Sequence, residues 1–387
     1  MPEAVIVATG RTPIGRAGKG SLVDVRPDDL LGFALENVVA RSGIDPALID
    51  DVVIGCTQQY GEANPMNVTR GATLLAGIPD NVPSTVVNRF CSSSLQAARM
   101  AFHAIKADEG DIFLVGGVDS CSRAIPADSE NAPEVFHPAF MGDDAICDLY
   151  MTMGMTAEKV AELYDVSREE MDHFAQQSQE RAVAAQKNGF FDREMLPYTK
   201  PNGTVVELDD GPRPSSTYEK LAELPPAFKE DGRVTAGNSC PLNDGAAAFM
   251  MMSAAKAEEL GVEPVARVLS TGVSGLDPTI MGVGPIEAVR KAVKRAGLTA
   301  DDIEVLELNE AFASQVIAVA RELGIDPFSD RLNPHGGGIA LGHPFGATGA
   351  RMMATLISDL ETLDRRIGVE TMCVGTGMGL AMVVERL

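Results

Sequence analysis

The sequence predicts an α/β fold built from two similar halves with largely parallel strands. Short aliphatic runs alternate with amphipathic helical segments, which is typical of strand–helix–strand units. Two pairs of segments also match in the same order, residues 40–55 with 294–309 and residues 91–117 with 343–372. One repeated unit explains both matches, whereas chance similarity between two α/β units would have to explain each match separately.

The elements of the first half follow one another in a regular order. The strand-like run AVIVATG at 4–10 is followed by a helical segment at 28–43 and an aliphatic strand at 48–56. The helix stops at Gly43, and Gly297 holds the same place in the matching segment of the second half. Glycine at both positions predicts the same helix ending twice.

The next helix begins just after Cys91. Apolar side chains recur at three- and four-residue steps from Leu95 through Phe102, and the preceding serines are good N-cap residues. Cys91 then lies at the positive end of a helix, where free N–H groups lower the pKa of a thiol. The alternative is a buried structural cysteine beside a cap, and this segment alone favours neither.

The end of the first half is displaced along the chain. The strand-like run at 245–253 resembles the closing run at 379–387. The long stretch before residue 245 contains helical segments mixed with segments rich in Pro, Gly and Asp. Such a stretch is too long for a plain connection. The predicted domains are a first half at 1–255 with its core at about 1–118 and 246–255, a loop domain inserted at about 119–245, and a second half at 256–387.

The overall composition excludes several classes of partner. A net charge of −23 and a pI near 4.6 argue against nucleic acid, because nothing offsets phosphate repulsion. No apolar run reaches about 18 residues, so no membrane span is expected. The N-terminal run lacks the basic start and long apolar region of a secretion signal, which predicts a cytoplasmic protein.

Six cysteines and five histidines limit the metal and disulfide chemistry. The cysteines form no CxxC pair, so neither a metal site nor a disulfide framework is expected. Each is by default a small buried apolar residue. They lie at positions 56, 91, 121, 147, 240 and 373.

A glycine-rich segment at 333–351 surrounds His343 just before another helix. It lacks the Lys-Ser/Thr ending of a P-loop, so a nucleotide site is not favoured. A single histidine in a loop is more often structural than catalytic. The repeat changes this balance, because Ala98-Arg99-Met100 matches Ala350-Arg351-Met352 and so aligns Cys91 with His343. Packing of the two halves about a pseudo-twofold axis would bring these side chains face to face.

Two further motifs add polar groups. CVGTGMG at 373–379 has a G-x-G-x-G spacing, but a strand rather than a helix follows it, so a dinucleotide site is excluded. The remaining interpretation is a tight turn that presents Cys373 and the backbone N–H of Gly375. In ELNEAF, Asn309 follows a strand, where it could polarise a carbonyl or orient water, or cap a helix. Together these groups suggest acyl transfer, with one thiol carrying a thioester, the other moving protons at carbon, and N–H groups stabilising an oxyanion.

These motifs resemble those of the thiolase family, the acyl-CoA:acetyl-CoA C-acyltransferases, over the whole chain. Four catalytic segments occur in the family's order, and two further segments are also similar to it. They are VNRFCSSSLQA (87–97), LNEAFA (308–313), GGGIALGHPFGATG (336–349) and CVGTGMG (373–379), with MGMTAEKVA (153–161) and TAGNSCPLNDGAAA (235–248).

The resemblance implies a layered αβαβα core and a role for each motif. Cys91 would be acylated, and His343, with a water held by Asn309, would help deprotonate it and line one oxyanion hole. Cys373 would be the acid/base at carbon, and the N–H groups of Cys91 and Gly375 would form a second oxyanion hole. The loop domain would bind CoA.

The resemblance also implies substrates and assembly. The expected partners are acyl-CoA, acetyl-CoA and free CoA, without a metal or redox cofactor, in a homodimer or homotetramer. Association with other β-oxidation enzymes is a further expectation. The implied CoA- and acyl-contacting residues are Arg213, Ala236, Gly237, Cys240, Met153, Ala311 and Phe312.

Four positions depart from the family's pattern. Ser94 stands where glycine is common, Cys240 where a serine usually contacts CoA, and His335 where asparagine is usual. Thr152 replaces a histidine of short-chain biosynthetic members, which favours degradation of 3-ketoacyl-CoA in β-oxidation. The alternatives are a biosynthetic acetoacetyl-CoA thiolase, a ketoacyl synthase, which uses no second cysteine, and a non-catalytic CoA- or lipid-binding scaffold.

Overall fold

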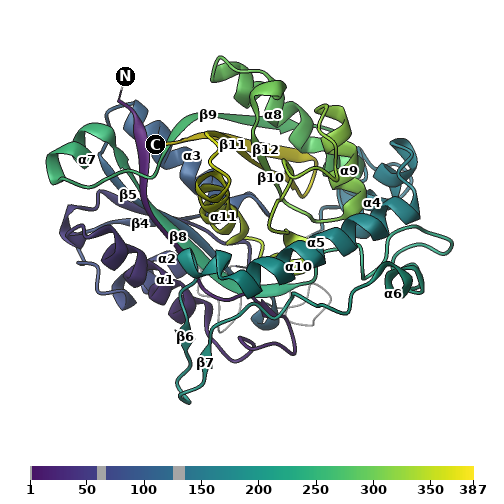
Figure 1. Ribbon diagram of the computed structural model, residues 1–387, viewed down its shortest axis with the longest axis horizontal. Helices are drawn as coiled ribbons and strands as arrows, with labels where there is room; N and C mark the ends of the chain where they lie inside the picture. Colours follow the sequence, from purple (N-terminus) through teal and green to yellow (C-terminus); the bar gives the residue numbers. More distant parts are fainter. Residues whose placement is uncertain (1, 59–66, 125–135) are drawn as a thin grey trace.

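The computed structural model describes residues 2–58, 67–124 and 136–387 (Figure 1). Its strands are β1 (Ala4–Arg11), β2 (Gly15–Arg16), β3 (Asp51–Gly55), β4 (Ser84–Val87), β5 (Ile112–Ser120), β6 (Tyr198–Thr199), β7 (Val205–Val206), β8 (Asn243–Ser253), β9 (Ala266–Gly275), β10 (Val305–Leu308), β11 (Ile367–Val374) and β12 (Met378–Arg386). Its α-helices are α1 (Pro27–Ser42), α2 (Val68–Leu75), α3 (Ser93–Lys106), α4 (Met153–Leu163), α5 (Arg168–Asn188), α6 (Tyr218–Ala222), α7 (Ala254–Leu260), α8 (Gly284–Arg295), α9 (Ala313–Glu322), α10 (Gly338–Leu341) and α11 (Thr348–Thr362).

The strands form two half-sheets joined edge to edge. Their order is β10-β11-β12-β9-β1-β8-β5-β3-β4, with the short β2 beside β8, and β6 pairs separately with β7. The two halves meet where β1 pairs antiparallel with β9 through Ala4, Val5 and Ile6. The expectation of largely parallel strands is wrong, because among the strands that the structure describes in the main sheet only the pairs β3–β4, β3–β5 and β10–β11 are parallel. Strand β8 returns from the long insertion and lies antiparallel between β1 and β5.

Three helix layers alternate with the two half-sheets. Helices α1 and α2 cover the outer face of the first half-sheet, and α8 and α9 cover that of the second. Helices α3 and α11 contact each other and strands of both halves, and α11 occupies the middle of the molecule in Figure 1. This confirms the layered αβαβα core and its duplicated halves. The exact limits of the predicted domains stay a prediction.

The repeated sequence signals produce repeated local structure. Helix α1 begins with Pro27 in its first turn and ends at Gly43, whose φ is +67°. After α8, Gly297 has a φ of +75°, in the left-handed region that glycine adopts without strain. A short 3-10 helix follows each glycine, and then β3 or β10. Helix α11 is buried almost all round, as expected for a central helix.

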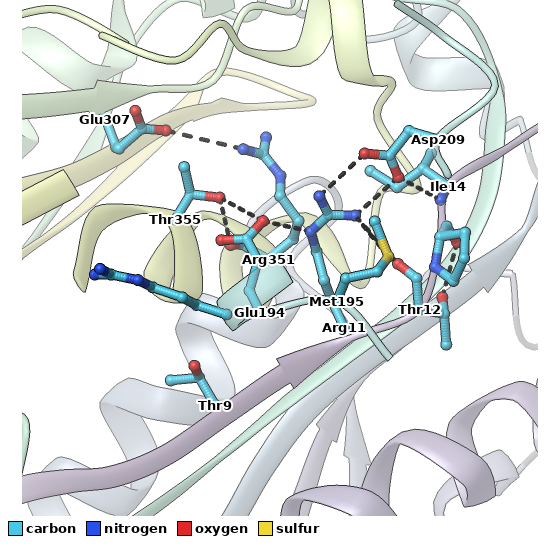
Figure 2. A network of polar contacts seen from close by, with 12 residues as sticks. Thr9, Arg11, Thr12, Ile14, Glu194, Met195, Asp209, Glu307, Arg351 and Thr355 are labelled. Carbon is cyan, nitrogen blue, oxygen red and sulfur yellow. Dashed lines mark hydrogen bonds and ion pairs between the residues drawn. The ribbon is translucent and has the colours of Figure 1, made fainter. Parts of the chain in front are cut away.

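The insertion between β5 and β8 packs across both halves. Apolar residues of α4 and α5 join the core of the second half, although the insertion leaves from the first. Beside the central helices, Arg11 of β1 is fully buried and pairs with Glu194 at 2.5 Å and Asp209 at 2.8 Å (Figure 2). Thr355 of α11 donates to Glu194 at 3.3 Å. The network thereby ties the insertion to the first strand and to the central helix of the second half.

Within the described ranges, no helix combines the length and apolarity needed to cross a bilayer. The same residues contain no group of three or more His, Cys, Asp or Glu side chains that could hold a metal ion.

Candidate active site

Cys91 lies in a sharp turn between β4 and α3. The turn depends on Phe90, which has a φ of +45°, an uncommon conformation for a bulky residue. Ser93 holds it: its hydroxyl donates to the Phe90 carbonyl at 2.6 Å and accepts from the N–H of Arg89 at 2.9 Å. Ser92 occupies the N-cap position but makes no side-chain cap bond. The serines after Cys91 therefore secure the turn that presents the thiol.

The Cys91 thiol is protonated in the resting protein. Burial raises the pKa of Cys91 to about 12, and the N–H groups of Cys91 and Gly375, which favour the thiolate, offset only part of this effect. The nearby carboxylate of Asp119 raises the pKa further. Burial outweighs the two N–H groups, so these groups lower the pKa as expected but the net shift is upward, and the expected lowered pKa is wrong.

His343 is buried, and its hydrogen bonds define its tautomer. Its Nδ1 lies 2.7 Å from the Thr348 hydroxyl, whose hydrogen is donated to the Pro344 carbonyl at 2.8 Å. Nδ1 must then carry the proton, so Nε2 holds the free lone pair and faces the side-chain amide of Asn309 at 3.2 Å. Burial, assisted by Arg351, lowers the pKa of His343 to about 3. The histidine is thus a neutral imidazole that carries its proton on Nδ1 and its lone pair on Nε2.

Cys373 and Gly375 lie at the hairpin between β11 and β12. The turn needs positive φ at Thr376 and Gly377, and a side chain on Gly375 would meet Phe90 at 3.4 Å. The hairpin turn that follows Cys373 therefore lies against the turn that carries Cys91. Burial and the neighbouring thiols of Cys91 and Cys240 raise the pKa of Cys373 well above its usual range.

The glycine-rich segment around His343, here called the histidine loop, meets α3, the helix that follows Cys91. They meet at the first turns of α3 and α11. The hydroxyl of Ser94 accepts from the N–H of Ala350 at 2.9 Å, and a Cβ on Gly349 would lie 2.7 Å from the N of Leu95. Ser94, which departs from the family pattern, is thus used as a contact between the two helices. The structure brings together the two segments that the repeat aligned.

Three of the seven predicted substrate-contacting residues lie around Cys373. Ala311 and Phe312 pack with it in one apolar cluster, and Cys240 packs against that cluster. The N–H of Cys240 donates to the Ala311 carbonyl at 3.0 Å. Phe312 also contacts Phe228, which lies against the start of α4.

The remaining predicted contacts lie further out. Ala236 is exposed and Gly237 half-buried in a turn just before Cys240, while Met153 is 39% exposed at the start of α4. Arg213 lines a surface hollow of about 350 Å³ together with Lys187. Contact of these four residues with CoA stays a prediction.

The structure adds three residues that the sequence motifs did not single out. Thr348 sets the tautomer of His343, and Asn243 accepts a hydrogen bond from the backbone N–H of His343 at 2.9 Å. Asp119 accepts from the N–H of Gly346, in the loop that carries His343, and from the N–H of Gln58, in the segment after β3. Thr348 could have been found from its position at the start of the second central helix. Asn243 lies within the family-like segment 235–248, whereas nothing local in the sequence marks Asp119, because its partners come from distant segments.

Comparisons with known proteins agree along the whole chain. The family descriptions that match are "Thiolase, N-terminal domain" over residues 4–255 and "Thiolase, C-terminal domain" over residues 262–386. A β-ketoadipyl-CoA thiolase of Pseudomonas aeruginosa is 45% identical, covering 100% of this chain and 99% of that protein. A 3-ketoacyl-CoA thiolase of Bacillus subtilis is 44% identical, covering 100% of both chains. The crystal structure of the Bacillus anthracis acetyl-CoA acetyltransferase matches with a TM-score of 0.91 and 38% identity, covering 100% of this chain and 99% of that one.

Proposed function

The chain belongs to the thiolase family, and we propose that it cleaves 3-ketoacyl-CoA through an acyl group held on the Cys91 sulfur. As a thiolase it is an acyltransferase. The observation that carries the assignment of roles is the position of the Cys91 thiol beside the N–H of Gly375 and the thiol of Cys373. One sulfur can then hold an acyl group while the other exchanges protons with the carbon that leaves.

In the first half-reaction, Cys91 attacks the 3-keto carbon while Nε2 of His343 takes its proton. The neutral imidazole is in the correct state for this step, because its pKa lies near 3. The N–H groups of Cys91 and Gly375 are suited to stabilise a thioester oxygen, and Asn309 and His343 to stabilise an oxyanion on the opposite side. Cleavage of the C2–C3 bond leaves an acyl-Cys91 and an acetyl-CoA carbanion.

Cys373 completes the proton transfers. Its raised pKa keeps it a thiol, so it can protonate the carbanion to release acetyl-CoA. The resulting thiolate then removes the proton of an incoming CoA thiol, which attacks the acyl-Cys91. The Cys91 thiolate leaves and takes back the proton from His343, which restores the free enzyme. Each step moves an acyl group or a proton without a change of oxidation state, so we propose that no metal or redox cofactor takes part.

Two observations favour the degradative direction. Relatives named β-ketoadipyl-CoA thiolase and 3-ketoacyl-CoA thiolase are 45% and 44% identical to this chain. Thr152 occupies the N-cap position of α4, without a side-chain cap bond, where short-chain biosynthetic members carry a histidine. The alternative is a biosynthetic acetoacetyl-CoA thiolase, and the similarity to the structure of an acetyl-CoA acetyltransferase supports this alternative.

We also propose a homodimer or homotetramer. Among the described strands, β4 is the last of the main sheet on its side, and its four residues are only half-buried. Next to it in the chain, Phe90 is 43% exposed, and Met100 on the following helix is 39% exposed. An open strand edge beside apolar side chains is suited to pairing with a second subunit. The cytoplasmic location and an association with other β-oxidation enzymes stay predictions.

The test is a thiolysis assay on the wild type and on Cys91→Ser. The wild type is expected to turn over 3-ketoacyl-CoA repeatedly only when CoA is present and, when CoA is absent, to retain the acyl group of a radiolabelled substrate on Cys91. Cys91→Ser should lose both properties, and acyl-CoA should protect the wild type from iodoacetamide. Unchanged activity in the variant would refute the mechanism, and activity confined to acetoacetyl-CoA in a panel of chain lengths would overturn the degradative direction.

A further inference from the structure

Asp119 is a fully buried carboxylate at the end of β5 that the proposed mechanism does not use. It accepts hydrogen bonds from the hydroxyl of Thr57 at 2.7 Å, from the N–H of Gln58 at 2.9 Å and from the thiol of Cys56 at 3.4 Å. It also accepts from the N–H of Gly346 at 2.5 Å. Charge-assisted bonds of this kind are the strong ones in a protein interior.

The donors around Asp119 come from both halves of the chain. Thr57 and Gln58 follow β3, whereas Gly346 belongs to the loop before α11 and lies three residues after His343. The approach is very close: a Cβ on Gly346 would lie 2.7 Å from the Val118 carbonyl, and a Cβ on Gly117 would lie 1.9 Å from the Gly346 carbonyl. The carboxylate therefore sits where the histidine loop touches the first half-sheet.

The same carboxylate lies close to the nucleophile. A Cβ on Gly55, at the end of β3, would lie 2.2 Å from the N of Ser94 in the first turn of the Cys91 helix, so Asp119 binds a segment that supports this helix. Asp119 and the thiols of Cys240 and Cys373 act electrostatically on the Cys91 thiol, and His343 is its proposed base.

We propose that Asp119 is a positioning residue for acyl transfer, whose carboxylate holds the His343 loop against the segment that supports Cys91. The proposal rests on the proposed function, because the relative placement of these residues matters only if they form the nucleophile and base. Its negative charge has a second effect, since it opposes a thiolate at Cys91. Removal of the charge should therefore make the thiol more reactive and the enzyme slower.

The first variant is Asp119→Asn, which keeps the size but replaces one acceptor oxygen by a donor group. At least one of its N–H donors then loses its acceptor, and the histidine loop shifts. We expect kcat for thiolysis to fall about 10- to 100-fold, as for other small misplacements of reacting groups. The rate of Cys91 alkylation by iodoacetamide should instead rise about threefold or more at each pH between about 7 and 9, because the opposing charge is gone.

A second variant separates geometry from charge. Gly346→Ala adds a methyl group that would lie 2.9 Å from the carboxylate of Asp119, so it displaces the loop but keeps the charge. We expect kcat to fall without any rise in the alkylation rate. The control is Asp50→Asn, because Asp50 accepts the N–H groups of Asp111 and Ile112 at the opposite end of the same strand. It should leave both measurements unchanged.

The outcomes distinguish the proposal from its premise. If the wild type fails to form an acyl-Cys91, the proposed function fails and the proposal with it. If the wild type is acylated but Asp119→Asn keeps kcat within about twofold, the positioning role alone is refuted. A lower kcat with slower or unchanged alkylation also refutes it, because that pattern assigns Asp119 to general stability. Should Asp119→Asn not fold, Gly346→Ala decides, since a folded variant with wild-type kcat overturns the proposal.

Discussion

Substitution of Thr348 by valine tests the assignment of the basic nitrogen on His343. Valine has nearly the shape of threonine but cannot accept the hydrogen bond from Nδ1 that the structure shows at 2.7 Å. The proton can then move to Nε2, provided that Asn309 turns its amide so that Oδ1 faces the ring. That oxygen is buried and has no hydrogen-bond partner in the resting site, so the rotation replaces the contact of the Asn309 side-chain nitrogen with Nε2 by a bond from Nε2–H to Oδ1. The new state is well paired, but its Nε2 is no longer basic.

The size of the effect follows from the bond that is lost. A buried N–H without an acceptor costs about 1–3 kcal/mol. Relative to the alternative tautomer, this lowers the population of the reactive tautomer by about 5- to 150-fold. We expect kcat for thiolysis to fall by a factor in that range, with little change in the KM for CoA, because Thr348 is not placed on the substrate. Since the pKa of His343 lies near 3, the loss should not vary between about pH 6 and pH 9.

The assay is steady-state thiolysis of acetoacetyl-CoA, with the ring nitrogens of His343 followed by 15N NMR. Thr348→Ser is the matched control, because it keeps the hydroxyl and should retain most of the activity. Wild-type kcat in Thr348→Val, or an NMR spectrum that still shows a proton on Nδ1, would refute the tautomer argument.

Three further predictions concern charge, packing and pH. Arg11→Met should lower the free energy of unfolding by about 3–5 kcal/mol in a denaturant titration, since it leaves two buried carboxylates unpaired; a loss below about 1 kcal/mol would contradict this. Gly117→Ala should destabilise the fold by about 1–3 kcal/mol or more, because its Cβ would lie 1.9 Å from the Gly346 carbonyl, and an unchanged melting temperature would show that the loop can yield. Alkylation of resting Cys91 should accelerate about tenfold per pH unit between about pH 7 and pH 10, because its raised pKa keeps it a thiol; a plateau near pH 8 would instead reveal a thiolate paired with His343.

The sequence predicted the layered fold because the two halves carry the same signals at matching positions. Gly43 and Gly297 both have positive φ just after a helix, and the central helices follow Cys91 and His343. The strand directions were not predictable from alternation alone. The long insertion allows β8 to return antiparallel between β1 and β5, a pairing that depends on tertiary contacts.

For the candidate site, the sequence indicated the reactive side chains but not their electrostatics. The position of Cys91 near a helix start predicts a lowered pKa, whereas the folded site raises it, because burial depends on residues that lie far away in the chain. The sequence did not indicate Asp119 as a site residue for a related reason. A lone acidic residue at the end of a strand is unremarkable until Gly346, from the other half, is seen to bind it.

The separation of Cys91 and His343 onto two copies of one unit has a consequence for folding. Each residue lies just before a central helix of its own half, and the two helices touch only when both halves have docked. A chain with one half folded holds a thiol without a base, or a base without a thiol. Such an intermediate is catalytically silent rather than partly active, so the recovery of turnover during refolding reports the docking of the halves and not the folding of either one.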